Sequence, residues 1–271
     1  MKRFTIQDLT PAVVALLLLC APAASGASLD HSAFDALLRK HVASGMVDYD
    51  AFAAAPEFPK YLAALAKADP AALDDKERLA YWINVYNAYT IELINAHKER
   101  ESIRNINTTL GFAGKGPWHE KLVKAGGKVY HLDNVEHDII RKQWSEPRIH
   151  FALVCAAMSC PPLRSEAYTG PKLEGQLADQ ARRFLIETPS ANRVDVPSAT
   201  VYGSMIYASY YREDFGSTDA KIGAYLAQFY PDGPEKQLLL SGKFKLVGTH
   251  YDWTLNSQEQ ARKLATPGLK P

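Results

Sequence analysis

The residues best suited to chemistry in this chain lie in one short stretch, RIHFALVCAAMSCPPLR at residues 148–164. His150 stands before an apolar run that ends at Cys155, and Cys160 follows five residues later. A thiol activated by a nearby imidazole can act as a nucleophile, whereas two thiols in an oxidising compartment can pair. The stretch therefore predicts either a reactive Cys155 or a disulfide between Cys155 and Cys160.

The apolar run HFALVC (150–155) is typical of a buried strand, because it is short, continuous and followed by a turn rich in proline. Side chains alternate along a strand, so His150 is expected to face away from Cys155. The base for a nucleophilic Cys155 should then come from another element. The candidates are His137, His131 and His250.

A disulfide between these cysteines needs a sharp turn. It requires Cα atoms about 4.4–6.8 Å apart, whereas five residues of straight strand span about 16 Å. Pairing is therefore expected only if the chain turns back immediately after Cys155, which the small residues Ala156, Ala157 and Ser159 permit. Closing so short a loop stabilises by only about 2 kcal/mol, so the reduced protein is expected to stay folded.

A second polar group lies in HLDNVEHDIIRKQW (131–144), which predicts a helix from Asn134 to about Trp144 capped by Asp133. Glu136 falls within the apolar stripe of this helix, and His137 lies at its edge. A carboxylate in a core-facing stripe must find a cation or a hydrogen-bond donor. The expected partners are Arg148 and His150. An internal salt bridge and a catalytic role are both consistent with this pattern.

The stretch AYWINVYNAYTIELI (80–94) predicts a helix that is buried on both faces, here taken as residues 79–97. It contains Asn84 and Asn87. An unpaired buried amide costs about 1–3 kcal/mol. These amides are therefore expected either to bond to neighbouring backbone and fix the packing, or to orient a histidine or line a substrate cleft.

The remaining pattern predicts an α+β fold: one helix-rich domain with a small sheet around the central helix at 79–97. Apolar periodicity indicates further helices at 30–45, 57–68, 173–187 and about 219–230. Strand-like segments are expected at 128–132, 194–196, 201–209 and 244–253, the third with partly helical character.

The first 27 residues resemble a secretory signal peptide, with Lys2 and Arg3 before an apolar run and small residues up to Ala27. We therefore expect a cleaved signal at 1–27, one domain at 28–260 and a flexible tail at 261–271. The mature protein should be periplasmic or secreted, without an integral membrane segment. Its 31 basic and 30 acidic residues nearly balance, which disfavours nucleic acid as a partner.

The spacing of histidines and cysteines does not favour a metal site. His131 and His137 are six residues apart rather than four, and there is no paired Cys-x-x-Cys motif. We expect no metal and no cofactor, and a small molecule or a peptide as substrate. No pattern in the sequence predicts an oligomeric state.

Six segments together resemble the bacterial exported branch of the domain-of-unknown-function 547 (DUF547) family. They are GMVDYDAF (45–52), LAYWINVYNAYTIELI (79–94), LDNVEHDIIR (132–141), RIHFALVCAAMSCPPLR (148–164), SYYREDFG (209–216) and HYDWTLN (250–256). The resemblance implies a recurring domain without a firmly established activity. Its polar positions fall here on Asn84, Asn87, Glu136, His137, His150 and Cys155. Plant relatives keep the first cysteine position and replace the second, which favours Cys155 over Cys160 as the functional thiol.

These observations leave three hypotheses for function. The leading one is a cysteine-dependent hydrolase or acyl transferase acting on a peptide, amide or thioester, with Cys155 as nucleophile and His137 as base. Glu136 or Asn87 would then orient the imidazole or stabilise the oxyanion, and Asn84, His150 and Arg148 would contact the substrate. The alternatives are a non-catalytic binding or assembly module whose buried polar network is structural, and a thiol–disulfide redox role.

Overall fold

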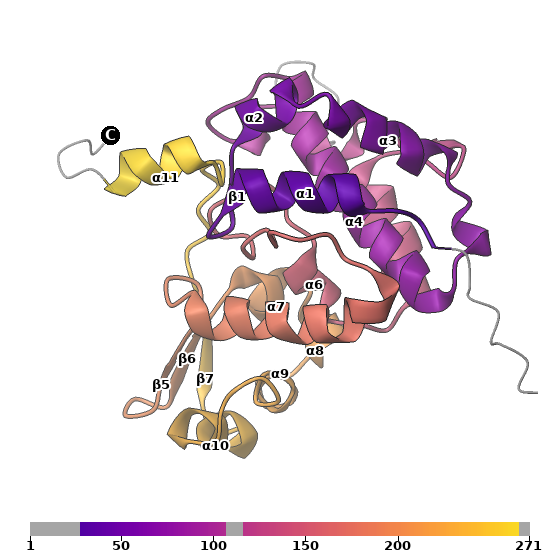
Figure 1. Cartoon of the computed structure of the whole chain (residues 1–271). Helices are drawn as coiled ribbons and strands as arrows, with labels where there is room; N and C mark the ends of the chain where they lie inside the picture. Colours follow the sequence, from indigo (N-terminus) through magenta and orange to yellow (C-terminus); the bar gives the residue numbers. More distant parts are fainter. Residues whose placement is uncertain (1–27, 107–115, 266–271) are drawn as a thin grey trace, which may run out of the picture.

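The computed structural model describes residues 28–106 and 116–265, as an α+β fold rich in helices (Figure 1). The expected signal peptide lies outside the described residues, as do residues 266–271 of the expected tail. The first part of that tail is helical, because the last helix continues to Ala265. None of the helices in the described ranges is both long and apolar enough to cross a membrane.

The α-helices are distributed over the whole of the described chain. They are α1 (Ser32–His41), α2 (Tyr49–Ala54), α3 (Glu57–Lys67), α4 (Asp75–Ala96), α5 (Arg141–Gln143), α6 (Ile149–Ala152), α7 (Leu173–Glu187), α8 (Arg212–Phe215), α9 (Asp219–Leu226), α10 (Pro234–Ser241) and α11 (Gln258–Ala265). Shorter 3₁₀ turns are η1 (Pro70–Ala72), η2 (Ile103–Asn105), η3 (Pro117–His119) and η5 (Gly170–Lys172). Two segments are π-helical, namely η4 (Asn134–Ile140) and η6 (Ile206–Tyr210).

The strands are short and form small separate sheets. They are β1 (Val42–Ala43), β2 (Met46–Val47), β3 (Val123–Ala125), β4 (Lys128–Tyr130), β5 (Arg193–Asp195), β6 (Thr200–Gly203) and β7 (Lys245–Gly248). The pairs β1–β2 and β3–β4 are antiparallel hairpins. In the third sheet β6 lies between β5, which is antiparallel to it, and β7, which is parallel to it.

Helix α4 is the centre of the larger core, as expected for a helix that is apolar on both faces. Asp74 caps its first turn by accepting a hydrogen bond from the Glu77 amide. Helices α2, α3 and α7 all pack against it, and Asn84 and Asn87 are only 1 % and 3 % exposed. The prediction of a central buried helix is confirmed.

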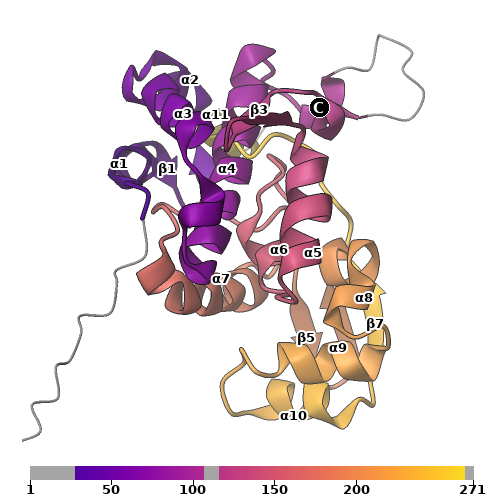
Figure 2. The same ribbon diagram turned by 90° about the vertical axis from the view of Figure 1, so that its right-hand side faces the viewer.

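A second, smaller core lies on the far side of α7 and joins that helix to the three-stranded sheet and helices α8–α10 (Figure 2). The short helix α6 links the two cores. Ile149 and Ala152 pack into the larger one, whereas Phe151 packs into the smaller one against Phe184 and Phe215. The Tyr251 ring packs against both cores. The surface between the two cores is therefore a natural place for a cleft.

The N-terminus of α1 is attached to the start of α4 through the buried His31. Its Nδ1 lies 2.7 Å from the Tyr61 hydroxyl, and its Nε2 lies 3.8 Å from Glu77 Oε1. Burial outweighs the attraction of nearby carboxylates, Asp30 included, and lowers the pKa of His31 from 6.5 to about 4. His31 is therefore neutral in the folded protein at neutral pH.

The lowered pKa of His31 predicts a loss of stability in mild acid. Between pH 6.5 and about 4 the unfolded chain binds a proton at His31 that the folded chain does not. The free energy of unfolding should therefore be highest above pH 6.5 and decrease as the pH is lowered towards 4. The shift corresponds to about 3 kcal/mol at about 1.4 kcal/mol per pKa unit. We expect urea unfolding across this range to show that slope in the wild type and a flatter one in His31→Gln. Equal slopes would contradict the assignment.

Candidate functional site

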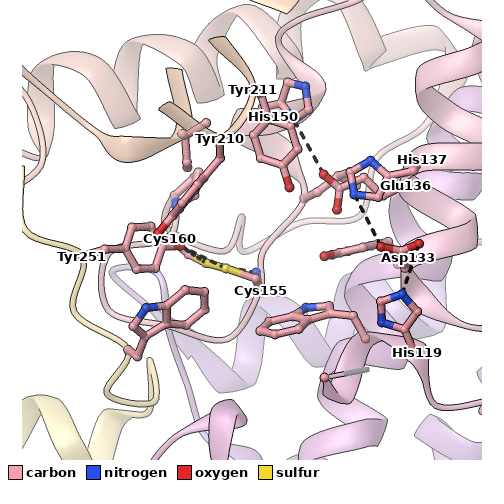
Figure 3. Close-up of a pocket in the computed structure, with 17 residues that line it drawn as sticks. His119, Asp133, Glu136, His137, His150, Cys155, Cys160, Tyr210, Tyr211 and Tyr251 are labelled. Atoms are coloured by element: carbon pink, nitrogen blue, oxygen red, sulfur yellow. Dashed lines mark hydrogen bonds and ion pairs between the residues drawn. A yellow bond between two sulfur atoms is a disulfide. The ribbon is translucent and has the colours of Figure 1, made fainter. Parts of the chain in front are cut away.

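A pocket of about 540 Å³ opens between the two cores (Figure 3). Its walls are largely aromatic, formed by Tyr86, Trp118, Tyr210, Tyr211, Tyr251 and Trp253. The polar lining combines histidines, carboxylates and cysteines, namely His119, Asp133, Glu136, His137, His150, Cys155 and Cys160. An apolar pocket with a few convergent polar groups is the usual form of a small-molecule site.

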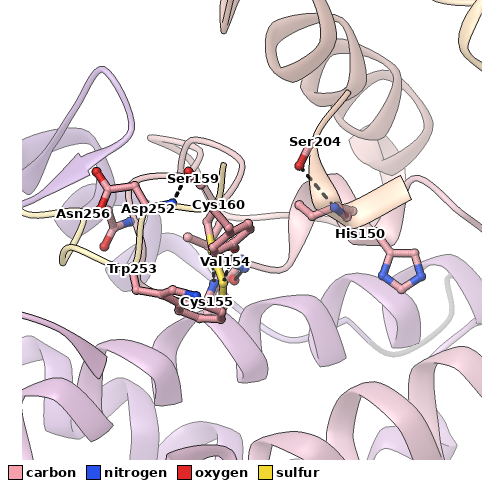
Figure 4. The surroundings of a disulfide bond; sticks show 12 residues. His150, Val154, Cys155, Ser159, Cys160, Ser204, Asp252, Trp253 and Asn256 are labelled. Atoms are coloured by element: carbon pink, nitrogen blue, oxygen red, sulfur yellow. Dashed lines mark hydrogen bonds between the residues drawn. A yellow bond between two sulfur atoms is a disulfide. The ribbon is translucent and has the colours of Figure 1, made fainter. Parts of the chain in front are cut away.

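The two cysteines form a disulfide in one wall of this pocket, with Cα atoms 6.2 Å apart (Figure 4). The chain turns back directly after Cys155, where Ala156 takes a left-handed conformation with φ of 61°. A non-glycine residue rarely adopts this conformation, which tends to occur where the surroundings enforce it. The Tyr251 hydroxyl lies 3.1 Å from each sulfur.

The turn that carries the cysteines is held by a segment near the C-terminus. Backbone amides of Met158 and Ser159 donate to the carbonyls of Thr254 and Asp252, at 2.8 and 3.2 Å. The Asp252 amide in turn donates to the Ser159 hydroxyl at 2.8 Å. These contacts fix the turn independently of the disulfide.

Reduction of the disulfide should therefore leave the protein folded. The loss of about 2 kcal/mol that chain entropy predicts for so short a loop corresponds to a few degrees, since 1 kcal/mol shifts the melting temperature of a domain this size by about 2–4 °C. We expect the melting temperature to fall by less than about 10 °C on reduction. A larger fall, measured by calorimetry with and without reductant, would contradict this reading.

The expected strand at 150–155 is wrong, because none of these residues belongs to a strand. Residues Ile149–Ala152 form the short helix α6, and only the segment after Ala152 is extended. A short apolar run buried on all sides has no periodicity that separates strand from helix. The alternation that would have turned His150 away from Cys155 therefore does not apply, and both residues line the same pocket.

Asn87 makes the hydrogen bonds to the segment after Ala152 that a neighbouring strand would otherwise make. Its side-chain amide donates to the Ala152 carbonyl and its oxygen accepts from the Val154 amide, both at 3.0 Å. Asn84 makes the same pair of bonds to the backbone of Tyr168, at 2.7 and 3.0 Å. Both amides thus bond to backbone and fix the packing. Neither lines the pocket, so the expected roles of Asn87 in orienting an imidazole and of Asn84 in contacting substrate do not fit this geometry.

Glu136 is buried in the pocket wall and faces His150, as one of the expected pairings proposed. Glu136 Oε1 lies 3.7 Å from His150 Nδ1, and His150 Nε2 lies 2.7 Å from Asp214 Oδ2. Arg141 binds both oxygens of Asp214 at 2.7 Å. The hydrogen bond from His150, followed by Arg141, holds the pKa of Asp214 well below its usual range. Asp214 is thus a fixed anion that orients the His150 ring.

Two tyrosines surround the Glu136 carboxylate. Burial, reinforced by the charge of Glu136 and a hydrogen bond to it, raises the pKa of both Tyr86 and Tyr211 far above the usual value. Their hydroxyls therefore remain protonated and donate to Glu136. Tyr211 also stacks on the His150 ring, with centroids 3.9 Å apart. The positions of the Glu136 carboxylate and the His150 imidazole are therefore both fixed by contacts with these tyrosines.

His137 lies across the pocket from the disulfide and has a different set of partners (Figure 3). Its Nδ1 lies 2.9 Å from an Arg141 nitrogen, which can only donate, so Nδ1 accepts and the ring proton is on Nε2. That Nε2 lies 3.6 Å from Asp133, which also faces His119 at 3.7 Å. Asp133 therefore bridges two histidines and makes no side-chain cap on η4, contrary to expectation.

Three other expected residues lie away from the pocket. Arg148 does not pair with Glu136 but with Glu146 and Glu174. His131 accepts a hydrogen bond from the Asn134 amide at 3.0 Å, and His250 is exposed. The expected roles of Arg148 in contacting substrate and of His131 and His250 as bases are therefore not supported by their positions.

Both π-helices of the described residues contribute to the pocket wall. Glu136 and His137 come from η4, and Ile206 and Tyr210 come from η6. A π-helical turn has poorer geometry than an α-helical one and occurs often at functional sites. Among residues 28–106 and 116–265, no group of three or more His, Cys, Asp or Glu side chains is arranged to hold a metal ion.

Comparison with known proteins bears on residues 70–185, which match the model of a family described as protein of unknown function, DUF547. This segment belongs to the DUF547 family. No curated protein matches the chain, and no solved structure does. The DUF547 segment includes helix α4, both cysteines and the residues Glu136, His137 and His150.

Part of the pocket comes from residues beyond the DUF547 match. Tyr211 and Tyr251 line the pocket and follow the match in the chain. Asp214 also follows it and contacts the pocket residue His150. Sequence reasoning assigned a role to none of the three. The family resemblance could have identified these residues, since SYYREDFG (209–216) and HYDWTLN (250–256) are among the segments that resemble the family. Arg141, four residues after His137 on the same helix face, could have been found by its spacing.

Proposed function

We propose that the pocket is the active site of a cysteine-dependent hydrolase or acyl transferase, active when the Cys155–Cys160 disulfide is open. The observation that supports this most is the position of Cys155, whose sulfur lines an aromatic pocket together with Glu136 and His150. A nucleophilic thiol needs a proton acceptor within the same cavity and a site where a carbonyl group can lie between them.

The proposed reaction begins when Cys155 transfers its proton to the Glu136–His150 pair and attacks the carbonyl carbon of an ester, thioester or amide. The new carbon–sulfur bond gives a tetrahedral intermediate, whose oxyanion can accept a hydrogen bond from the Tyr251 hydroxyl, 3.1 Å from the sulfur. The leaving group departs with the proton. Water or another acceptor then cleaves the thioester and regenerates the thiol.

The choice of Glu136 and His150 over His137 as the proton acceptor rests on their partners. The lone pair of His137 is used by Arg141, whereas the His150 ring is oriented by Asp214 through Nε2 and presents Nδ1 to Glu136. An anion that orients an imidazole is the arrangement by which hydrolases tune their bases. His137 and Asp133 then serve at the opposite wall, where they can contact the substrate.

Export is part of the same proposal. A chain delivered to the periplasm or secreted through the N-terminal segment would meet conditions in which a disulfide persists, and the proposed activity would then depend on a local supply of reductant. Fusing residues 1–27 to a reporter enzyme that works only after export would test this point.

The proposed activity can be tested with a panel of small aryl esters, thioesters and anilides. We expect the reduced wild type to release the leaving group and the oxidised wild type to be inactive. Cys155→Ala should lower the rate in reductant by at least about a thousandfold, the scale seen when a catalytic nucleophile is removed. Equal turnover by Cys155→Ala and the wild type would exclude Cys155 as nucleophile.

A non-catalytic binding module is the second candidate, and the pairing of the two buried asparagines favours it. Asn84 and Asn87 both have partners within the chain, as purely structural buried groups would. On this reading the reduced and oxidised proteins would bind the same ligands in the aromatic pocket without turnover. The panel above separates the two, since only an enzyme releases the leaving group.

A further inference from the structure

The two sulfurs of the disulfide differ in access. Cys155 is partly exposed and Cys160 is only 4 % exposed, although both belong to the pocket wall. A nucleophile that enters the pocket therefore reaches the sulfur of Cys155 first. Which sulfur is attacked, and how well the other can leave as a thiolate, together decide the course of disulfide exchange.

The surroundings of Cys160 are suited to a departing thiolate. The backbone amide of Cys155 donates to Cys160 Sγ at 3.1 Å, and the Tyr251 hydroxyl lies at the same distance. Burial, followed by the charges of Tyr210 and Glu136, raises the pKa of Tyr251, so its hydroxyl remains a donor. Hydrogen bonds to a charged acceptor are stronger than those to a neutral one, so both bonds strengthen as negative charge develops on the sulfur.

We infer that the Cys155–Cys160 disulfide is a thiol-exchange site that is opened by a small-molecule thiol bound in the aromatic pocket. The thiolate attacks Cys155 Sγ and forms a mixed disulfide, and the electron pair of the broken bond leaves with Cys160. A second small thiol then attacks the small-molecule sulfur of the mixed disulfide. The disulfide of the two small thiols is released, and Cys155 leaves as a free thiolate. The two thiols supply the two electrons. As a regulatory step this inference rests on the proposed function, because it exposes the proposed nucleophile.

The pocket also limits the thiol to a small molecule. A volume of about 540 Å³ lies within the range of small-ligand sites, about 300–1,000 Å³. Cys155 lines the pocket together with Tyr210, Tyr251 and Trp253, and the ring of Tyr251 contacts the other two rings. A thiol of tripeptide size can enter such a space, whereas a thiol on a large carrier cannot.

The turn that carries Cys160 keeps the exchange reversible. Because Met158 and Ser159 are bonded to the 252–254 backbone, the thiolate stays next to the mixed disulfide instead of moving away. Reclosure then needs only the return of the same two sulfurs to contact. The site can thus alternate between a closed and an open state without unfolding.

The test treats the oxidised, full-length wild type with reduced glutathione, quenches with acid, alkylates the free thiols and maps the peptide that contains both cysteines. We expect early samples to carry glutathione on Cys155 and the alkyl label on Cys160. Tyr251→Phe should slow opening by about tenfold or more, as expected for the loss of one hydrogen bond to a charged group. Tyr202→Phe is the matched control, because Tyr202 lies on β6 and does not line the pocket, and it should open at the wild-type rate.

Three results would overturn the inference: glutathione on Cys160, opening only after the protein is denatured, or equal rates with glutathione and with a thiol on a large polymer. A melting curve for each variant shows that slow exchange is not a folding defect. The measurement uses no acyl substrate. Exchange at Cys155 without acyl transfer would reject only the proposed function, and acyl transfer with exchange at Cys160 would reject only this inference.

Discussion

Replacing Glu136 with glutamine should lower the rate of Cys155 acylation in the reduced protein by about 10²- to 10⁴-fold, the usual contribution of a general acid–base group. Glutamine has the same shape and its oxygen can still accept from the hydroxyls that surround this position, so the pocket should stay intact. It cannot take a proton from the thiol. The rate is measured as the burst of leaving group from an activated ester under single-turnover conditions.

Asp138→Asn is the matched control for this substitution. Asp138 lies on the same π-helix as Glu136, is exposed, and pairs with Lys142 outside the pocket. We expect it to acylate at the wild-type rate, and both variants to melt within a few degrees of the wild type. If Glu136→Gln acylates as fast as Asp138→Asn, the carboxylate has no part in proton transfer.

Replacing Asn87 with alanine should produce the largest loss of stability among single substitutions near the pocket. It leaves the Ala152 carbonyl and the Val154 amide without partners in a buried site. Each unpaired buried group costs about 1–3 kcal/mol, so the free energy of unfolding should fall by about 2–6 kcal/mol. Chemical denaturation of the reduced and oxidised proteins measures this difference.

Asn105→Ala gives the comparison for an exposed asparagine, whose side chain donates to Glu99. Its effect should stay within about 0.5 kcal/mol, as for most surface changes. A loss for Asn87→Ala no larger than that for Asn105→Ala would mean that the bonds at 152–154 contribute nothing to the fold. The Asn87 variant should also change the accessibility of Cys155, because the segment that it holds leads directly into the turn.

Sequence reasoning succeeded where one pattern determined the structure. The apolar stretch around Asn84 could only be a helix buried on both faces, and α7 was expected at the residues where it is found, Leu173–Glu187. The run at 150–155 failed because a short stretch buried on every side has the same composition as helix or strand. What settles its shape is a distant side chain, Asn87, which no local pattern reveals.

The candidate site was predictable only in part for the same reason. Glu136 was identified because a carboxylate in an apolar stripe needs a partner, and His150 was among the partners expected. Tyr251 comes from far along the chain and packs against the second core where it lines the pocket, and Asp214, equally distant in sequence, reaches the site through its hydrogen bond to His150. The choice between His137 and His150 as base depended on the hydrogen bond from Arg141 to His137 Nδ1. No sequence pattern predicts that contact.

The most direct test of the central claim is the mass of the Cys160→Ser variant after reaction with a small thioester in the absence of reductant. This variant cannot form the disulfide, so Cys155 should be permanently open to the pocket. We expect one acyl group per chain, mapped to Cys155 and removed by hydroxylamine, while the oxidised wild type gains none. A Cys160→Ser protein that is folded and binds ligands in the pocket, yet neither takes up an acyl group at Cys155 nor releases the leaving group, would contradict the account.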